Sequence, residues 1–357
     1  MLISICIPHY NRSRYLLAVL DSIVCQDYPE LEVVISDDCS TDDSNEVVPA
    51  YVASKSGATP IRFRYIHQER NLGYDGNVRA VLAAGSGEYL FILGNDDALA
   101  SPGAISSLVR SLQAHDQPDV AFTNYHMYGH ADQPVRRAYS TRLIGSGVDV
   151  ALAWFRSFSF VAGIVIRREA FQRHDTPDYD GSIYIQIYLA ARIIAAGGRL
   201  ATIEETMVVK DVMVDGKLPN SYADTLVAKN RRFTRKTGGL DQVGRVACDA
   251  ILPFVGREKR KAFLVAIYRQ ILTNSYAFWL WDYRSKGAFK AAVNLALGCW
   301  PGNLIKTETT VWTKIRISIT YILVTLAGLF APLPLLARLK DILRKRRAVT
   351  ANIMMEP

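Results

Sequence analysis

Short apolar runs alternate with polar loops and amphipathic segments through the first half of the chain. Three runs have the length and largely apolar character of buried strands: Leu2–Ile7, Leu31–Ser36 and Tyr89–Leu93; a further strand is expected at Ile61–His67. Between the runs, apolar residues recur at helical spacing from Tyr15 to Gln26, where Ser13 is the expected N-cap, and from Val78 to Ala84. Strands that are apolar throughout are covered on both faces, so the pattern predicts an α/β domain with a doubly wound sheet.

The alternation of strand and helix continues beyond this region and then gives way to helix. Further elements are expected as a helix at Ala104–Ala114, strands at Val120–Tyr128 and Phe160–Arg167, a helix at Ile183–Ala196 and a strand at Arg199–Glu204. The later segments are helical in pattern: Ala223–Thr234, Gln242–Phe254, Glu258–Tyr283, Lys286–Leu297 and the stretch from Val311 on. Turn residues cluster between Asp215 and Asn220. They predict a boundary between an α/β domain, residues 1–216, and a helical C-terminal region, residues 217–357.

Pairs of acidic residues directly follow two of the predicted strands. Asp96 and Asp97 come after the run that begins at Tyr89, and Asp37 and Asp38 come after the second run. Open α/β sheets bind ligands just beyond the carboxyl ends of their strands. Adjacent carboxylates repel each other, so a divalent cation that carries a phosphate, Mg²⁺ or Mn²⁺, is the simplest occupant. The alternative is an ordinary solvated turn.

Four sequence motifs occur in order in this part of the chain. They are Ile5–Arg12, Val34–Asp43, Asn71-Leu72-Gly73 with Asn77, and Gly85–Tyr89 leading into Asn95-Asp96-Asp97. In type and spacing, over roughly the first 100 to 210 residues, they resemble the motifs of the family 2 glycosyltransferases. These are inverting enzymes with a GT-A fold that use nucleotide-diphospho-sugars. The form Asn-x-Gly-x-Asp-x-Asn is most similar to the abequosyltransferase-type enzymes of bacterial surface-polysaccharide assembly. The resemblance implies a GT-A doubly wound mixed sheet, followed here by the helical C-terminal region.

The resemblance also implies roles for individual residues in binding the donor. The residues that would bind the nucleotide are Pro8, Tyr10, Arg12, Asp38, Asn71 and Asp96. Asp38 would accept a hydrogen bond from the base, because a carboxylate is an acceptor only; the alternative is that it caps the following helix. Asp97 would be the ligand of a divalent metal ion, Mn²⁺ or Mg²⁺, that neutralises the departing diphosphate. Asn95 stands where the family usually has an aspartate, a change that leaves Asp97 in place.

The sequence departs from the family pattern at the catalytic base. Family members show Glu-Asp three residues before a Leu-x-x-Arg helix, whereas Ile185-Gln186 precede Leu189–Arg192 here. Glutamine cannot take a proton, so Asp180, and next to it Asp178, are the expected bases for the acceptor hydroxyl. One alternative is that Asp180 is a loop or N-cap residue of the following helix. Another is that the chain is a non-catalytic nucleotide-sugar-binding or scaffold protein.

Charge and cysteine content narrow the choice of partners. The net charge of +8 favours anionic partners: nucleotide phosphates, nucleic acid or an anionic leaflet. The basic residues form no recognisable nucleic-acid-binding module, so we expect no nucleic acid partner. Lys210 could contact the diphosphate, although a solvated surface lysine is the commoner situation. Five cysteines without paired spacing suggest neither zinc nor disulfides, and the first apolar run is too short for a signal sequence, which predicts a cytoplasmic catalytic region.

The C-terminal region contains a stretch without charge, Ile317–Ala337, that is long enough to span a bilayer. Two prolines interrupt it near its end, and basic residues flank it on both sides. This pattern suits a membrane-associated segment, residues 315–347, that dips into the cytoplasmic leaflet and returns. The alternative is a helix buried against the catalytic domain. We therefore expect a glycosyltransferase at the cytoplasmic face of the inner membrane that acts on a polyprenyl-diphosphate-linked glycan.

Overall fold

The computed structural model describes residues 1–55, 57–219, 240–301 and 309–338. The chain divides into two compact units, residues 1–219 and residues 220–357. The predicted helix Ala223–Thr234 and the basic run beyond residue 338 lie outside the described residues. All of the predicted site residues belong to the first unit.

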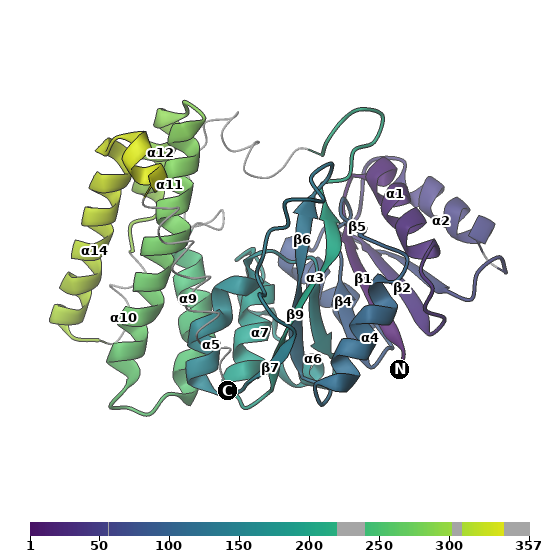
Figure 1. Ribbon diagram of the computed structural model, residues 1–357, viewed down its shortest axis with the longest axis horizontal. Coiled ribbons are helices and arrows are strands. Elements are labelled where there is room, and N and C mark those ends of the chain that lie inside the picture. The colour runs from purple at the N-terminus through teal and green to yellow at the C-terminus, as the bar shows by residue number, and fades with distance from the viewer. Residues whose placement is uncertain (56, 220–239, 302–308, 339–357) are drawn as a thin grey trace. The chain divides into compact units, whose positions relative to one another are not determined.

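The first unit is built on a mixed sheet of nine strands (Figure 1). They are β1 Ile3–His9, β2 Leu31–Asp37, β3 Arg62–His67, β4 Tyr89–Ile92, β5 Ala98–Leu99, β6 Val120–Met127, β7 Arg142–Gly145, β8 Ile164–Arg167 and β9 Leu200–Lys210. Their order is β3-β2-β1-β4-β8-β6-β9-β5, with β7 paired to β9. The strands β3, β2, β1 and β4 are parallel, whereas β8 is antiparallel to both of its neighbours. Because β2 and β4 lie on opposite sides of β1, the carboxyl end of β1 is a topological switch point, where open α/β sheets bind ligands.

Helices cover both faces of this sheet (Figure 1). They are α1 Ser13–Val24, α2 Ser44–Lys55, α3 Gly73–Ala84, α4 Ala104–Ala114, α5 Val148–Trp154, α6 Arg168–His174 and α7 Ile185–Ala195. The helices α1, α2 and α4 share one apolar core with alternate residues of the strands, such as Ile3, Ile5 and Ile7 in β1. The helix α3 packs on β1 and β2, and its buried Val78 and Val81 lie outside that core. Burial of both faces explains why β1, β2 and β4 are unbroken apolar runs in the sequence.

The first strand extends beyond Ile7, the end of the run that predicts it. β1 continues through Pro8 to His9, and Pro8 pairs with Ser36 of β2. Pairing of β1 with β4 ends at Cys6, so one side of the strand carries no ladder at Pro8 and the missing N–H is tolerated there.

Two helix starts also differ from the prediction. Ser13 is the first residue of α1 rather than its N-cap, and its N–H donates to Asp42 Oδ2 at 3.2 Å. The helix α3 begins at Gly73, ahead of the predicted start, and Asn71 Oδ1 accepts the Gly73 N–H at 3.0 Å. Both starts depend on side chains from neighbouring loops, which helical periodicity does not reveal.

The described part of the second unit is helical, as predicted. Its helices are α9 Leu240–Ile251, α10 Arg260–Gln270, α11 Ala277–Ser285, α12 Phe289–Gly298 and α14 Val311–Phe330, and a π-helical segment, Ile271–Tyr276, joins α10 to α11. The helix α14 packs on α10, α11 and α12, and buries Ile317 and Tyr321. It ends at Phe330, two residues before Pro332, which confirms the predicted interruption. Among the described residues, α14 alone is long and apolar enough to cross a membrane, by length and composition.

Candidate active site

Side-chain hydrogen bonds tie the loop after β1 to the loop after β2. Asn11, in the left-handed backbone region with φ 49°, accepts the Thr41 N–H on Oδ1 at 2.7 Å. Its own N–H donates to Ser40 Oγ at 2.9 Å. Asn77 of α3 donates to the carbonyl oxygens of His9 and Ser36, at 3.2 and 3.0 Å. The carboxyl ends of β1 and β2 are therefore held in fixed relation to each other and to α3.

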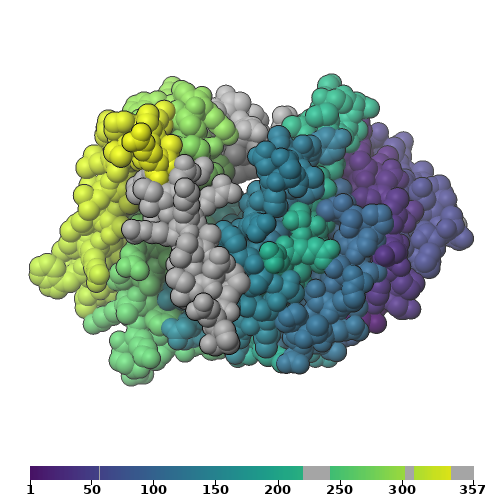
Figure 2. Space-filling model, in the orientation of Figure 1, coloured from purple at the N-terminus to yellow at the C-terminus, as the bar shows by residue number. Residues whose placement is uncertain are grey.

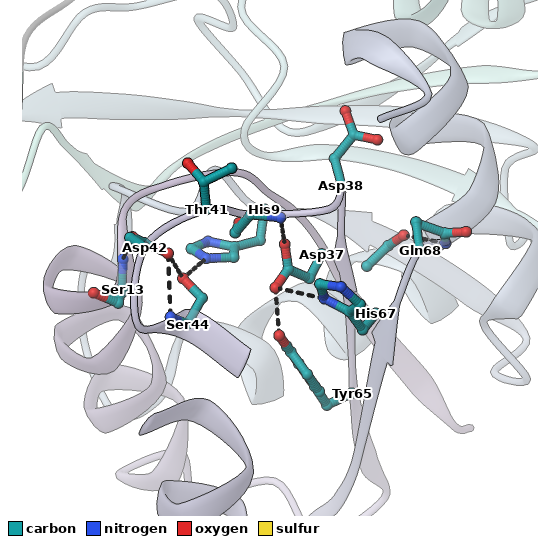
Figure 3. A network of polar contacts seen from close by, with 12 residues as sticks. His9, Ser13, Asp37, Asp38, Thr41, Asp42, Ser44, Tyr65, His67 and Gln68 are labelled. Atoms are coloured by element: carbon teal, nitrogen blue, oxygen red, sulfur yellow. Dashed lines mark hydrogen bonds and ion pairs between the residues drawn. The ribbon is translucent and has the colours of Figure 1, made fainter. Parts of the chain in front are cut away.

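His9 is buried at the end of β1 and connects two of these loops (Figure 3). Its Nδ1 accepts a hydrogen bond from Asn95 Nδ2, with 3.1 Å between the nitrogens. Nε2 therefore carries the ring proton and donates it to Ser44 Oγ at 2.7 Å, and Ser44 donates in turn to Asp42. Burial lowers the pKa of His9, so this imidazole is neutral at pH 7. It serves as a structural connection between the ends of β1 and β4.

The two adjacent carboxylates after β2 point in different directions (Figure 3). Asp37 accepts the Ser40 N–H at 2.9 Å and the hydroxyl of Tyr65. Burial opposes its charge, but these hydrogen bonds outweigh burial and hold the pKa of Asp37 below its usual value. Asp38 points away from this network, and its Oδ1 accepts the Leu72 N–H at 2.5 Å, where α3 begins. Burial raises the pKa of Asp38.

Asp38 thus makes the helix-start contact that was the alternative to its predicted role. A carboxylate can accept up to about four hydrogen bonds, so this contact leaves capacity for a base N–H. Asn71 has local partners as well: it donates to Asp38 O at 3.0 Å and accepts from Gly73. Of the other predicted nucleotide contacts, Tyr10 is 45% exposed in the loop after β1, and Pro8 is half-buried in that strand.

The carboxylates after β4 meet Arg12 and the chain that follows β9. Arg12 forms an ion pair with Asp96. Asp97 Oδ1 accepts the Asp211 N–H at 3.1 Å, and the Asp211 carboxylate pairs with Lys210. The structure thus brings Arg12, Asp96 and Asp97 together as predicted neighbours of one ligand. We call this group of side chains, Arg12, Asp96, Asp97 and Lys210, the rim. Lys210 is paired and largely buried there, so it is not a solvated surface lysine.

The electrostatics of the rim favour the binding of a cation. Asp97 is almost fully buried, and burial together with the charge of Asp96 raises the pKa of Asp97 to about 8. Burial also raises the pKa of Asp96, although the charge of Arg12 opposes that effect. The two carboxylates therefore resist being ionised together, and a cation placed between them would relieve the repulsion.

The backbone at Gly94 allows the two carboxylates to converge. A Cβ atom on Gly94 would stand 2.5 Å from Asp97 Oδ2 and 3.2 Å from Asp96 Oδ1, so one oxygen of each side chain faces the same point. Within the described stretches of the chain, no group of three or more His, Cys, Asp or Glu side chains could hold a metal ion. Mg²⁺ commonly takes one or two carboxylates, with substrate phosphates and water as its remaining ligands. Asp96 and Asp97 fit that donor set.

A half-buried arginine lies within electrostatic range of Asp97. Arg137, in the segment between β6 and β7, donates to the carbonyl oxygens of Thr123 at 2.6 Å, Phe160 at 2.8 Å and Ala162 at 2.9 Å. Burial lowers the pKa of Arg137 to about 10, and the charge of Asp97 is one of the effects that oppose this. Arg137 fixes the segment before β8 against β6. It lies in no recognisable motif, so no sequence signal pointed to it.

Asp180, the predicted base, lines a pocket of about 420 Å³ beside α3. Its Oδ2 accepts from Arg79 Nη1 at 3.0 Å, and the same guanidinium pairs with Asp175 at 2.6 Å. Asp178 is exposed on the 3-10 turn Pro177–Tyr179. Both predicted bases therefore lie near the surface, and Asp180 is held by an ion pair.

Asp75 provides the acceptor at the start of α7 that was the alternative role for Asp180. It is buried in α3 and accepts the N–H groups of Ile183 at 2.7 Å and Ile185 at 3.0 Å. Burial raises the pKa of Asp75, although these hydrogen bonds oppose the shift. Gln186, one residue on, is buried, and its Oε1 has no hydrogen-bond partner in the part of the chain that the structure describes. The single aspartate of the Asn-x-Gly-x-Asp-x-Asn motif was the sequence signal for Asp75.

Comparison with known proteins identifies the family of the first unit. Residues 4–175 match the family model described as Glycosyl transferase family 2. An uncharacterized protein from Mycobacterium tuberculosis is 31% identical over 232 residues, which cover 60% of this chain and 60% of that protein. Abequosyltransferase RfbV of Salmonella typhimurium is 29% identical over 225 residues, 56% of this chain and 63% of RfbV. The GalNAc(5)-diNAcBac-PP-undecaprenol beta-1,3-glucosyltransferase of Campylobacter jejuni is 35% identical over 109 residues, 30% of this chain and 33% of that enzyme. The chain thus spans less than two thirds of the length of these relatives.

Two solved structures share the fold over most of the chain. Residues 1–349 of TarS from S. aureus, in complex with UDP, align with a TM-score of 0.59 at 15% identity, covering 92% of this chain and 91% of that one. The mannosyltransferase PcManGT from Pyrobaculum calidifontis, in complex with GDP-Man and Mn²⁺, aligns with a TM-score of 0.53 at 18% identity, covering 92% and 87%. At these identities the likeness concerns the fold. The resemblance seen in the sequence motifs is confirmed: residues 4–175 form a glycosyl transferase family 2 domain, and the first unit has the GT-A fold.

Proposed function

We propose that the chain is an inverting glycosyltransferase that moves a sugar from a nucleotide-diphosphate donor to a hydroxyl of a glycan acceptor in bacterial surface-polysaccharide assembly. The observation that carries this proposal is the convergence of Asp96 and Asp97 beside Arg12, at the carboxyl end of β4 in a family 2 domain. A buried acidic pair at a switch point of the sheet suits a diphosphate bound through a cation.

The donor would lie across the ends of β1, β2 and β4. Pro8 and Tyr10 would line the base and ribose pocket, with Asn71 at its edge, and Asp38 would accept a hydrogen bond from the base. Arg12 now neutralises Asp96, and its guanidinium could turn to a phosphate oxygen when the donor enters. The complex of TarS with UDP supports a nucleotide at this fold.

Asp97, assisted by Asp96, would hold Mn²⁺ or Mg²⁺. Such an ion supplies positive charge to the departing diphosphate. Its binding is supported by the raised pKa of Asp97 and by the approach of one oxygen of each carboxylate to the same point beside Gly94, and PcManGT was solved with Mn²⁺. Lys210 stands beside this site, where it could offset further negative charge.

Inversion requires the acceptor hydroxyl to attack the anomeric carbon from the face opposite the leaving diphosphate. The C–O bond to the diphosphate breaks as the new glycosidic bond forms, and the hydroxyl proton passes to a base. We assign the role of that base to Asp180. If an Asp180 variant transfers the sugar normally, Asp178 is the next candidate. Arg79 would orient the Asp180 carboxylate, while Gln186 has no basic group to offer.

The acceptor is proposed to be a glycan linked to a polyprenyl diphosphate, at the cytoplasmic face of the inner membrane. The undecaprenol-linked name of the Campylobacter relative and the apolar helix α14 support this assignment. The predicted membrane-associated segment, residues 315–347, would keep the chain at the cytoplasmic leaflet.

A second candidate is a nucleotide-sugar-binding protein without transferase activity. The observation in its favour is the buried amide of Gln186 at the expected position of the base. Both candidate proteins would bind the donor, but only the transferase would turn it over.

The test is a donor panel in two steps. Thermal shift with UDP-, GDP- and CDP-sugars plus Mn²⁺ first identifies the bound nucleotide, and release of that nucleoside diphosphate is then measured with and without lipid-linked acceptors. Release that depends on Mn²⁺ and is lost in Asp97→Ala would support the transferase. Tight donor binding with no release in the presence of any acceptor would favour the binding protein.

A further inference from the structure

A cleft lies between α10 and α14 within the second unit. Its volume is about 490 Å³. Three cationic side chains line it, Lys261 and Arg269 from α10 and Arg316 from α14. Its remaining wall includes Val265, Ala266 and Trp312. We call it the α10–α14 cleft.

The α10–α14 cleft carries charge of one sign. No acidic residue lines it, and Lys261, Arg269 and Arg316 are exposed. None of the three forms an ion pair with another residue that the structure describes, whereas Lys286 of the same unit pairs with Asp282 at 3.1 Å. Three such cations around an apolar floor are complementary to an anionic group that is attached to an apolar body.

A stripe of exposed apolar side chains runs along α14 from this cleft to the end of the helix, next to Arg316. This stripe, which we call the outer stripe, consists of Trp312, Ile319, Leu323, Leu326 and Phe330, each at least half exposed. At 3.6 residues per turn these side chains fall within about 60° of one direction. The buried residues of the helix point to the other side. In Figure 2 the yellow atoms of α14 form part of the visible surface of the molecule.

Polar contacts hold the inner face of α14 to its own unit. The hydroxyl of Tyr276 bonds to Thr325 Oγ1 at 2.7 Å, and Arg284 donates to the carbonyl oxygens of Gly328 at 2.9 Å and Ala331 at 2.7 Å. A membrane-spanning α14 would have to carry these neighbours, and the charged α10, into hydrocarbon. A helix with one packed face and one exposed apolar face suits the plane of the interface instead.

We propose that the α10–α14 cleft binds the phosphate headgroup of an anionic phospholipid, while the outer stripe lies in the surface of the leaflet parallel to the membrane. Lys261, Arg269 and Arg316 surround the phosphate, and Trp312 sits at headgroup depth beside it. The inference rests on the membrane association in the proposed function and names the surface and the lipid group responsible. In this proposal α14 lies in the plane of the membrane surface. It does not dip into the leaflet and return, as the sequence alone suggested for residues 315–347.

Flotation of the full chain with lipid vesicles tests the cleft. The chain should float with vesicles of phosphatidylcholine and phosphatidylglycerol and bind pure phosphatidylcholine weakly. Each basic residue near an anionic surface is worth roughly a fivefold change in partition, so the triple variant Lys261→Gln/Arg269→Gln/Arg316→Gln should bind about 100-fold more weakly. The matched control, Arg245→Gln/Arg257→Gln/Lys290→Gln, removes the same charge from exposed positions outside the cleft and should lose much less. Equal losses in the two triple variants would overturn the inference.

Two further measurements separate phospholipid binding from binding of soluble anions or of a polyprenyl diphosphate. Brominated lipids should quench the fluorescence of the wild type more than that of Trp312→Phe, and most strongly when bromine lies near the headgroup. Inorganic phosphate or pyrophosphate that binds without lipid at the same affinity would make the cleft a soluble-anion site and overturn the lipid assignment. Binding only to vesicles that contain a polyprenyl diphosphate would also overturn it.

The same assay distinguishes failure of the inference from failure of the proposed function. If the wild type floats with no vesicle, membrane association itself fails, and the cleft proposal falls with it. If wild type and cleft variant float equally, the association stands and only the cleft proposal is wrong. Neither outcome bears on donor turnover, which is measured separately with detergent-solubilised acceptor.

Discussion

Replacing Asp97 with Asn should abolish a proton release that accompanies cation binding. Burial and the charge of Asp96 raise the pKa of Asp97 to about 8, so at pH 7 this carboxyl is about 90% protonated when no cation is bound. A divalent ion needs the carboxylate as its ligand and must displace that proton. Binding of Mn²⁺ with the nucleoside diphosphate should therefore release nearly one proton at pH 7, and about one tenth of a proton at pH 9.

Isothermal titration calorimetry in buffers of different ionisation enthalpy measures this release. Asp97→Asn should release no proton and bind the nucleoside diphosphate as weakly with Mn²⁺ as without it. The amide oxygen can still accept the Asp211 N–H, so the fold should persist. Below pH 8 the apparent Mn²⁺ affinity of the wild type should fall up to about tenfold per pH unit.

Thermal unfolding without a cation gives an independent measurement of the same group. Because the folded-state pKa of Asp97 lies above its unfolded value, its contribution to stability is full below pH 4 and is lost as the pH rises towards 8. The slope is at most about 1.4 kcal/mol per pH unit, and Asp97→Asn should remove it. Unchanged Mn²⁺-dependent affinity in the variant, or no proton release by the wild type at pH 7, would refute the assignment of Asp97.

Three further predictions concern the base, a buried contact and the C-terminal helix. Asp180→Asn should lower turnover in a transfer assay by roughly 10² or more and leave donor affinity unchanged. Gln186→Ala should lower turnover less. Normal turnover by Asp180→Asn would move the role of the base to Asp178. Asp75→Ala leaves two buried N–H groups at the start of α7 unpaired and should lower the free energy of unfolding by about 1–3 kcal/mol in urea titrations, with Asp75→Asn milder. Truncation after Lys314 removes the buried contacts of α14 and should expose apolar surface in the second unit, which dye binding would detect; a truncated chain as stable as the full one would contradict this.

The strands of the first unit were predictable because burial on both faces requires unbroken apolar runs in the sequence. β1, β2 and β4 appear near their predicted bounds for this reason. β9 extends beyond its prediction, to Lys210, because Glu204 and Glu205 face outward in mid-strand and interrupt the apolar pattern. The segment Tyr139–Ser159 matched no pattern, since it contains a short strand, a short helix and a 3-10 turn.

The candidate site was predictable only where a motif carried it. Arg12, Asp96 and Asp97 came from motifs, and the structure places them in one rim. The hydrogen bonds of Asp75 join residues more than one hundred positions apart, and Arg137 acts through backbone carbonyl groups. Such contacts depend on the tertiary fold, and local sequence patterns do not predict them.

The connection from Asn95 through His9 and Ser44 to Asp42 has a consequence for how the rim responds to its surroundings. Burial lowers the pKa of His9, and hydrogen bonds from Ser44 outweigh burial and lower the pKa of Asp42, so at and above pH 7 the imidazole is neutral and the carboxylate is charged. The loops after β1, β2 and β4 are thus joined by a link whose protonation does not change above pH 7, whereas Asp97, with a pKa of about 8, loses its proton in that range. Above pH 7, a change of pH therefore alters the charge of Asp97, and so the cation affinity of the rim. It leaves the hydrogen bonds that position the loops unchanged.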